Sequence, residues 1–192
     1  MAKDDVQEAL VNFAEQVYQA SEEYGPTHRR TALGYCNMGR LFHYTKDYVT
    51  SNSLFRQVVT IWTEFVDPIL DEMTAESSVP KIPGMKKETT VWIQGSDKFE
   101  AEDSLMYCYY NQKECMRIPG QCFVTALDLA NTCYALSVLF YIWKRLQEAD
   151  KQAAEGLQYL EDKQIHDPVF VKKFNKVMKL ATKSAHWEPD IQ

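Results

Sequence analysis

The sequence predicts an all-α fold, and three observations support this prediction. Of the 192 residues, 45% are hydrophobic and 25% are charged, which is typical of a globular chain long enough to bury a sizeable core. Glycine and proline are scarce, at seven each, and the prolines cluster outside the periodic segments. Apolar residues recur at steps of three and four, which indicates long helices rather than a turn-rich β fold.

Seven helices are expected from this periodicity. They lie near residues 4–24, 28–44, 47–73, 97–117, 122–145, 147–163 and 167–186. Asp47 is expected to start the third helix. Asp167 followed by Pro168 is typical of an N-cap and the first helical position, so these two residues start the last helix.

The segment between the third and fourth helices, residues 74–98, contains two prolines, two glycines and no sustained period. It is predicted to be a long irregular connection. It separates N-terminal helices in residues 1–73 from C-terminal helices in residues 99–192. Trp92 is expected to anchor the connection to the body of the protein, and contact of this side chain with a partner is the alternative.

The most apolar stretch, FVTALDLANTCYALSVLFYIW, covers Phe123–Trp143 in the expected fifth helix. Asp128 and Asn131 interrupt it, and the remaining run from Cys133 is too short to cross a bilayer. A helix that is apolar on most sides is typical of one packed between other helices. No membrane span is therefore predicted.

The charge and cysteine content limit the class of protein. A net charge of −6 argues against nucleic acid as the main partner, because phosphate binding needs concentrated lysine and arginine. The start, MAKDDVQEAL, lacks the apolar core of a signal peptide, which favours a cytoplasmic location. The cysteines show no CxxC or Cys/His clustering, which favours reduced thiols in helices over a zinc site. They are Cys36, Cys108, Cys115, Cys122 and Cys133.

A pattern of small and large residues occurs twice in the chain. The first copy places one set on one helix face and, after a turn at Lys46-Asp47, a second set on the next helix. The two sets are Tyr35, Met38, Gly39 and Phe42, then Ser51, Phe55 and Val58. Gly39 and Ser51 are expected to let the helices approach closely, while Phe42 and Phe55 fill the space between them.

The second copy keeps the same spacing. It consists of Cys133, Leu136, Ser137 and Phe140, then Ala149, Ala153 and Gly156. The distance from Gly39 to Ser51 and that from Ser137 to Ala149 are both twelve residues. Near the N-terminus, Ala9, Phe13 and Gln16 fit the second-helix half alone, and they precede Ser51, Phe55 and Val58 by 42 residues.

These patterns resemble the tetratricopeptide repeat, a helix-turn-helix unit of about 34 residues. The stretch EEYGPTHRRTALGYCNMGRLF, Glu22–Phe42, resembles the longer repeats of kinesin light chains. Most of the chain, including SLFRQVVTIWTEFV and the tail IHDPVFVKKFNKVMKLATKS, resembles the C-terminal repeat region of the flagellar family that combines a MYND zinc finger with tetratricopeptide repeats. The dense Cys/His signature of the MYND finger has no counterpart here.

The resemblance implies a right-handed stack of helix-turn-helix repeats with a terminal sealing helix. It also implies a non-catalytic protein–protein interaction scaffold in a flagellar or ciliary axoneme, in a dynein-linked assembly with another tetratricopeptide protein as partner. The alternative is a cytosolic cargo or chaperone adaptor of kinesin-light-chain type.

First helices of such repeats line a concave face, which implies a groove beside the packing residues of the second expected helix. The groove residues would be Cys36, Asn37, Arg40, His43 and Tyr44. Asn37 would hydrogen-bond a partner backbone, Arg40 would pair with a carboxylate and Tyr44 would add rigid contact area. The alternative is that these side chains are solvated or cover a neighbouring helix. Arg40→Glu is expected to leave the melting temperature nearly unchanged.

The equivalent face of the second copy is much more apolar. It consists of Asn131, Tyr134, Ala135, Val138, Tyr141 and Ile142. Such a face is too apolar to lie open to water, so another segment or another protein must cover it. A cover from within the chain, such as the long connection, is favoured.

The last helix has two opposed stripes. A basic stripe, with steps of four, three and four residues, consists of Lys172, Lys176, Lys179 and Lys183. An apolar stripe lies almost opposite it at 100° per residue and consists of Phe170, Phe174, Val177 and Ala181. We interpret this helix as the seal of the stack with a solvated basic face. Contact of the lysines with an acidic partner, such as the acidic tubulin surface, is the alternative.

The sequence contains no pattern typical of an enzyme or a cofactor site. His43 and Asp47 have the spacing of a metal pair, but no third ligand is nearby and Asp47 is better explained as a helix start. We find no nucleophile triad, P-loop, dinucleotide fingerprint or paired carboxylates. No catalysis, metal, cofactor or small-molecule ligand is therefore predicted.

Overall fold

The computed structural model describes residues 3–76, 96–118 and 124–185, and these form seven helices and no strand. The helices are α1 (Lys3–Tyr24), α2 (Arg29–Tyr44), α3 (Tyr48–Glu76), α4 (Ser96–Cys115), α5 (Ala126–Ile142), α6 (Leu146–Asp162) and α7 (Pro168–Ala185). The predicted all-α class is confirmed, and each predicted helix is found with ends within four residues of those expected. The predicted connection falls largely on residues 77–95, and Trp92 and Cys122 also lie outside the described residues.

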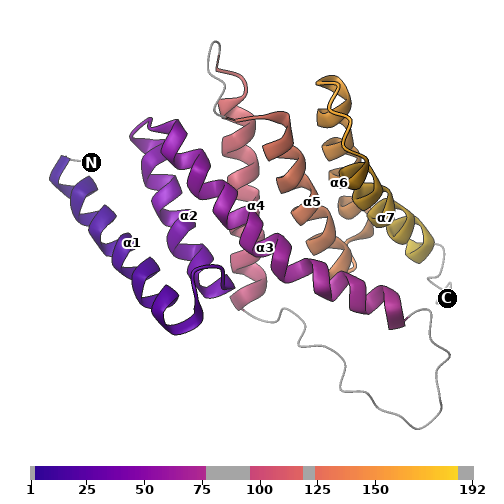
Figure 1. Cartoon of the computed structure of the whole chain (residues 1–192), viewed down its shortest axis with the longest axis horizontal. Coiled ribbons are helices and arrows are strands. Elements are labelled where there is room, and N and C mark those ends of the chain that lie inside the picture. Colours follow the sequence, from indigo (N-terminus) through magenta and orange to yellow (C-terminus); the bar gives the residue numbers. More distant parts are fainter. Residues whose placement is uncertain (1–2, 77–95, 119–123, 186–192) are drawn as a thin grey trace, which may run out of the picture.

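The helices follow one another as an elongated antiparallel array, with α1 at one end and α6 and α7 at the other (Figure 1). The most extensive contacts are between successive helices: α1 with α2, α2 with α3, α5 with α6, and α6 with α7. The long helix α3 crosses the array and also contacts α4 and α5. Consequently the two halves of the chain share one continuous hydrophobic core.

The turn between α2 and α3 and the turn between α5 and α6 are built alike, 98 residues apart. In the first, Lys46 N–H donates to His43 O and Asp47 N–H donates to Phe42 O. In the second, the donors Lys144 and Arg145 bond to the carbonyls of Tyr141 and Phe140 in the same pattern. Lys46 and Lys144 both have left-handed backbone, with φ of 65° and 62°. Both turns are therefore Schellman motifs with lysine at the position that glycine usually takes.

Lys46→Gly is expected to raise the free energy of unfolding by about 1 kcal/mol, because an L-residue pays a steric penalty in left-handed backbone that glycine avoids. Urea unfolding of the wild type and the variant would measure the change. Lys163→Gly is the matched control, since Lys163 caps α6 with φ of −103° and has no left-handed strain to relieve. Equal effects of both substitutions would contradict this account.

Small residues allow close helix contact, as the sequence predicts. A Cβ atom added to Gly39 of α2 would lie 2.5 Å from Phe55 Cε1 of α3, and Ser51 Oγ donates to Gly39 O at 2.9 Å. In the second half, a Cβ atom on Gly156 of α6 would meet Phe174 of α7, with Cε1 at 2.6 Å. Most of the expected packing residues are buried: Gly39, Ser51, Phe55, Val58, Cys133, Leu136, Ser137, Phe140, Ala149, Ala153 and Gly156. Tyr35, Met38 and Phe42 are half-buried.

The apolar helix α5 lies between other helices, which confirms the interpretation of its sequence. Nearly all of its residues are buried, and α3, α4, α6 and α7 all contact it. Within the described ranges, none of the helices combines the length and apolar character that a bilayer span requires.

One expectation about prolines is wrong: Pro68 lies inside α3, where it removes one backbone donor from the helix.

Candidate protein-binding surfaces

The α2 face predicted to line a groove is largely covered by α4. Cys36 is fully buried, so its thiol cannot line an open groove. The Arg40 guanidinium pairs with Asp103 of α4 at 2.5 Å and lies 4.2 Å from the Tyr107 ring centroid. His43 Nε2 lies 3.9 Å from a Glu114 oxygen of the same helix. The open-groove interpretation is therefore corrected for Cys36, which is buried, whereas Arg40 and His43 follow the alternative and cover the neighbouring helix α4.

The remaining two residues of that face differ in exposure. Tyr44 is 60% exposed and Asn37 is half-buried. Arg40→Glu is no longer expected to be neutral, because the new carboxylate would face Asp103 and leave the Tyr107 ring without its cation. Of the predicted α2 set, Tyr44 is thus the side chain best placed to reach a partner.

The apolar face of α5 is covered from within the chain, as favoured from the sequence. Tyr134, Val138 and Tyr141 are buried, so they cannot contact a partner in this structure. Tyr134 donates a hydrogen bond to Asp67 of α3 at 2.7 Å, and its ring packs edge-on against Phe174 of α7. The cover thus includes α3 and α7, two long-range neighbours that the sequence pattern does not reveal.

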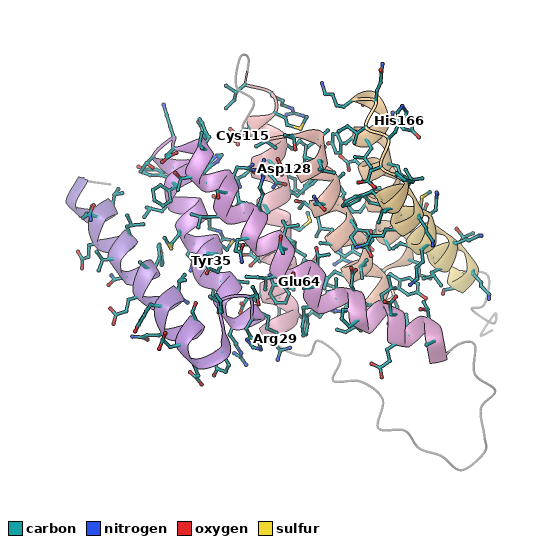
Figure 2. The ribbon with its side chains drawn as sticks, in the orientation of Figure 1. Arg29, Tyr35, Glu64, Cys115, Asp128 and His166 are labelled. Atoms are coloured by element: carbon teal, nitrogen blue, oxygen red, sulfur yellow. The ribbon has the colours of Figure 1, made fainter. Side chains whose placement is uncertain are left out.

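A polar groove of about 320 Å³ lies between α3 and α5, and we call it the α3/α5 groove. It is lined by Arg56, Val59, Thr60, Thr63, Glu64, Gln112, Asp128 and Asn131, so Asn131 is the one predicted α5 residue that reaches it. Figure 2 labels Glu64 and Asp128, which mark the groove on α3 and α5.

Asp128 organises one end of this groove. Arg56 donates to both of its carboxylate oxygens, at 2.6 and 2.8 Å, across 72 residues of sequence. Thr125 and Asp128 also form a capping box at the start of α5. Burial would raise the pKa of Asp128, but the hydrogen bonds from Arg56 and Thr125 outweigh it and hold this pKa below its usual value. The Thr-x-x-Asp spacing is visible in the sequence and could have revealed the cap, whereas Arg56 could not have been identified as the partner.

Asp128→Asn is expected to lower the free energy of unfolding at pH 7 by about 1–3 kcal/mol, since it leaves Arg56 without its carboxylate. The pKa of Asp128 is lower in the folded chain, so its stabilisation is complete above the unfolded pKa of about 4 and is lost as the pH falls through the folded pKa. The difference in the free energy of unfolding between the wild type and Asp128→Asn should therefore shrink below about pH 4. Urea unfolding at several pH values tests this, with the exposed Asp162→Asn as control. A gap that stays constant with pH would contradict the assignment.

A second polar cluster joins α4 to α6 and was not predicted. One oxygen of Glu155 accepts hydrogen bonds from Lys113 at 2.8 Å, Tyr109 at 2.5 Å and Tyr159 at 2.9 Å. Burial would raise the pKa of Glu155, but these donors hold it below its usual value. The carboxylate is held in a packed interface by three donors, which is the arrangement of a structural cross-link between helices.

Four cysteines lie in the described residues, and all four are free and buried: Cys36, Cys108, Cys115 and Cys133. Burial raises the pKa of the Cys108, Cys115 and Cys133 thiols, which makes them poor nucleophiles. Within the described ranges there is no group of three or more His, Cys, Asp or Glu side chains placed to hold a metal ion.

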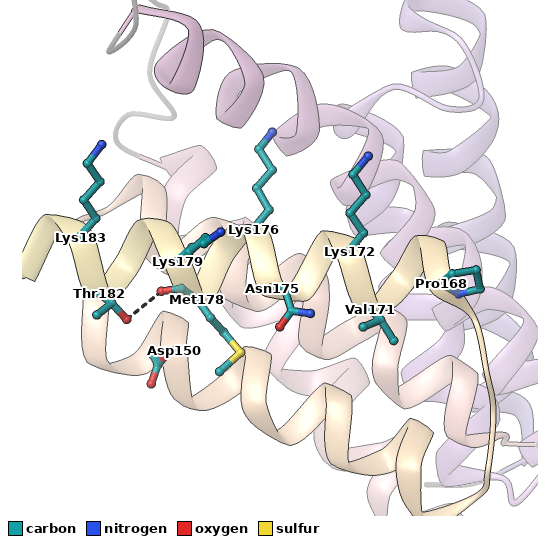
Figure 3. A pocket seen from close by; sticks show the side chains of 10 residues that line it. All are labelled: Asp150, Pro168, Val171, Lys172, Asn175, Lys176, Met178, Lys179, Thr182 and Lys183. Carbon is teal, nitrogen blue, oxygen red and sulfur yellow. Dashed lines mark hydrogen bonds between the residues drawn. The ribbon is translucent and has the colours of Figure 1, made fainter.

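An open groove of about 1020 Å³ runs along the outer side of α7, and we call it the lysine groove (Figure 3). It is lined by Asp150 of α6 and by Pro168, Val171, Lys172, Asn175, Lys176, Met178, Lys179, Thr182 and Lys183 of α7. The four lysines of the predicted basic stripe are exposed. Of the predicted apolar stripe, Phe174, Val177 and Ala181 are buried and Phe170 is half-buried against the core. The prediction that the apolar stripe belongs to the fold is confirmed.

The predicted N-cap of α7 is also confirmed, because Asp167 Oδ1 accepts hydrogen bonds from the backbone N–H groups of Val169 and Phe170.

Comparison of the chain with protein-family models, with curated proteins and with solved structures finds no match.

Proposed function

We propose that the chain is a non-catalytic protein-interaction scaffold, built as a right-handed tetratricopeptide stack and sealed by α7. The observation that carries the proposal is that two helix pairs, α2–α3 and α5–α6, combine the same turn at Lys46 and Lys144 with buried small residues at the same spacing; the turn alone is not specific, since α6 ends in the same way at Gln164. In the first pair, Ser51 donates a hydrogen bond to Gly39 O across the two helices. In the second pair, Ser137 and Ala149 are buried at the equivalent positions, and a Cβ atom added to Gly156 would lie 3.0 Å from Cys133 Cβ. A unit that recurs in this way is typical of repeat proteins, which present extended and preorganised binding surfaces.

The α3/α5 groove is the partner-binding surface that best fits a scaffold. It lies between α3 of the first helix pair and α5 of the second, and sites between packed helices are common places for ligands to bind. Thr60 and Glu64 are exposed on its rim, and Asn131 is half-buried beside them. The Arg56–Asp128 pair fixes the groove wall, so a partner segment would meet donors and acceptors already held in place.

The cellular setting comes from the resemblance to flagellar proteins with a MYND finger and tetratricopeptide repeats. On this basis the partner is an axonemal or other tetratricopeptide protein in a dynein-linked assembly of a cilium or flagellum. The partners are proteins, with no role for nucleic acid or membrane, in keeping with the net charge of −6.

A cytosolic cargo or chaperone adaptor of kinesin-light-chain type is the second candidate. The turn between α1 and α2 favours it, since its sequence resembles those longer repeats. Gly25 has a left-handed φ of 97° there, and Thr31 Oγ1 donates to Gly25 O at 2.9 Å. These two features fix the conformation of the turn that joins α1 to α2.

Affinity capture from flagellated cells, followed by protein identification, tests the proposal. The wild-type chain is compared with Thr60→Arg/Glu64→Lys, which blocks the α3/α5 groove at two exposed positions, and with Gln158→Arg/Glu161→Lys, which makes the same charge change on the exposed side of α6. We expect axonemal proteins to be captured by the wild type and the α6 variant and lost from the groove variant. Capture of kinesin or chaperone components alone would favour the second candidate. Equal capture by all three chains would show that the partner does not use this groove.

A further inference from the structure

The two end helices of the array carry opposite charge. Helix α1 contains one lysine and six acidic residues, a net charge of −5, whereas α7 contains five lysines and no acidic residue, a net charge of +5. They lie at opposite ends of the molecule (Figure 1), so within one chain they cannot neutralise each other.

Helix α1 leaves one face without a neighbour. Among the helices that the structure describes, α1 packs only against α2, for example through Val17 at Gly34. On the opposite side, at 100° per residue, lies a stripe in steps of three and four: Glu8, Val11, Glu15, Tyr18 and Glu22. All five are exposed, Val11 at 55% and Tyr18 at 65%. This acidic stripe therefore also contains two large apolar side chains in water.

The lysine groove of α7 has the complementary composition. Lys172, Lys179 and Lys183 make no ion pair within the described part of the chain, while Lys176 pairs with Asp71 at 2.6 Å. Val171, which is 38% exposed, and Met178 add apolar surface to the same groove. The groove can thus receive both carboxylates and apolar side chains.

The charges on the two helices also have the same spacing. Glu8, Glu15 and Glu22 are seven residues apart, as are Lys172 and Lys179, and both intervals correspond to about 10.5 Å along a helix. Two helices lying side by side can therefore pair several charges at once, with Val11 and Tyr18 meeting Val171 and Met178.

We propose that the acidic stripe of α1 docks into the lysine groove of a second copy of this chain. Because the two surfaces differ and lie at opposite ends, the contact is head-to-tail, so each added copy presents a further free surface until the assembly closes into a ring. This self-association is separate from the α3/α5 groove, and a scaffold built this way would present that groove at regular intervals.

Sedimentation velocity of the purified full chain, over a range of concentrations and salt, tests the proposal. We expect the wild type to associate with rising concentration and to dissociate at high salt, because the charges are exposed. Lys172→Glu/Lys179→Glu and Glu15→Lys/Glu22→Lys should each weaken association at least about tenfold. The chain with all four substitutions should associate again, because its charges are exchanged rather than lost.

Lys46→Glu/Lys163→Glu is the matched control, since it makes the same charge change at exposed positions outside both surfaces and should associate like the wild type. A wild type that stays monomeric, or a four-substitution chain that does not recover, would overturn the proposal. If the chain is monomeric but Lys172→Glu/Lys179→Glu loses an acidic protein in affinity capture, the groove belongs to that partner instead. The affinity capture with the α3/α5 groove variant tests the proposed function independently, so self-association and partner binding can each be disproved without the other.

Discussion

Replacing Gly39 by leucine is expected to lower the free energy of unfolding by about 3 kcal/mol or more, the upper range for overpacking a core. The first added carbon would already lie 2.5 Å from Cε1 and 2.8 Å from Cδ1 of Phe55. Phe55 is only 1% exposed and packs edge-on against Tyr107, so its ring has no space to move into. The helices α2 and α3 would have to separate, which would also break the hydrogen bond from Ser51 to Gly39 O.

Urea unfolding of Gly39→Ala, Gly39→Val and Gly39→Leu would measure a graded loss. Phe55→Leu, alone and combined with Gly39→Ala, completes a double-mutant cycle in which the smaller side chain relieves part of the clash. A coupling energy above about 1 kcal/mol is expected for two residues in direct contact. If Gly39→Leu unfolds at the same urea concentration as the wild type, the close approach at this position is wrong.

Phe174→Ala is expected to cost about 3–5 kcal/mol, which is the usual loss for a fully buried phenylalanine. Phe174 has no exposed surface, lies 5.7 Å from the ring of Tyr134 between centroids, and fills the space left by Gly156. It is therefore the main apolar anchor between α7 and the neighbouring helices α5 and α6. Without it, the lysine groove would lose its support.

Two measurements separate loss of α7 docking from general unfolding. Thermal or urea unfolding gives the stability change, and hydrogen exchange should show the earliest loss of protection in residues of α7. Val169→Ala is the control on the same helix, because Val169 is 62% exposed and should be nearly neutral. A small effect of Phe174→Ala, similar to that of the control, would show that α7 is not held by this side chain.

Features that depend on neighbours in sequence could be predicted, because local spacing determines them. The helix positions, the Asp167 cap and the close contact at Gly39 all follow from residues within a few turns of one another. The burial of α5 could also be predicted, since the run Cys133–Trp143 is apolar on most sides, and such a helix is stable only when several other helices cover it.

The polar face of α2 could not be predicted, because the position of α4 decides it. Arg40 meets Asp103 from 63 residues away, and Arg56 meets Asp128 from 72 residues away. Charged residues on a helix surface look alike in sequence whether water or another helix faces them. Only the packing of α4 against α2 and α3 distinguishes the buried Cys36 from the exposed Tyr44.

The length of α3 has a consequence for how the chain comes apart. Over 29 residues it contacts α2, α4 and α5, and its Asp67 and Asp71 reach Lys173 and Lys176 of α7. An array in which each unit touches only its neighbours loses units one by one from the ends. Here a single helix contacts both the N-terminal and the C-terminal helices, so the chain should unfold in one cooperative transition rather than in stages.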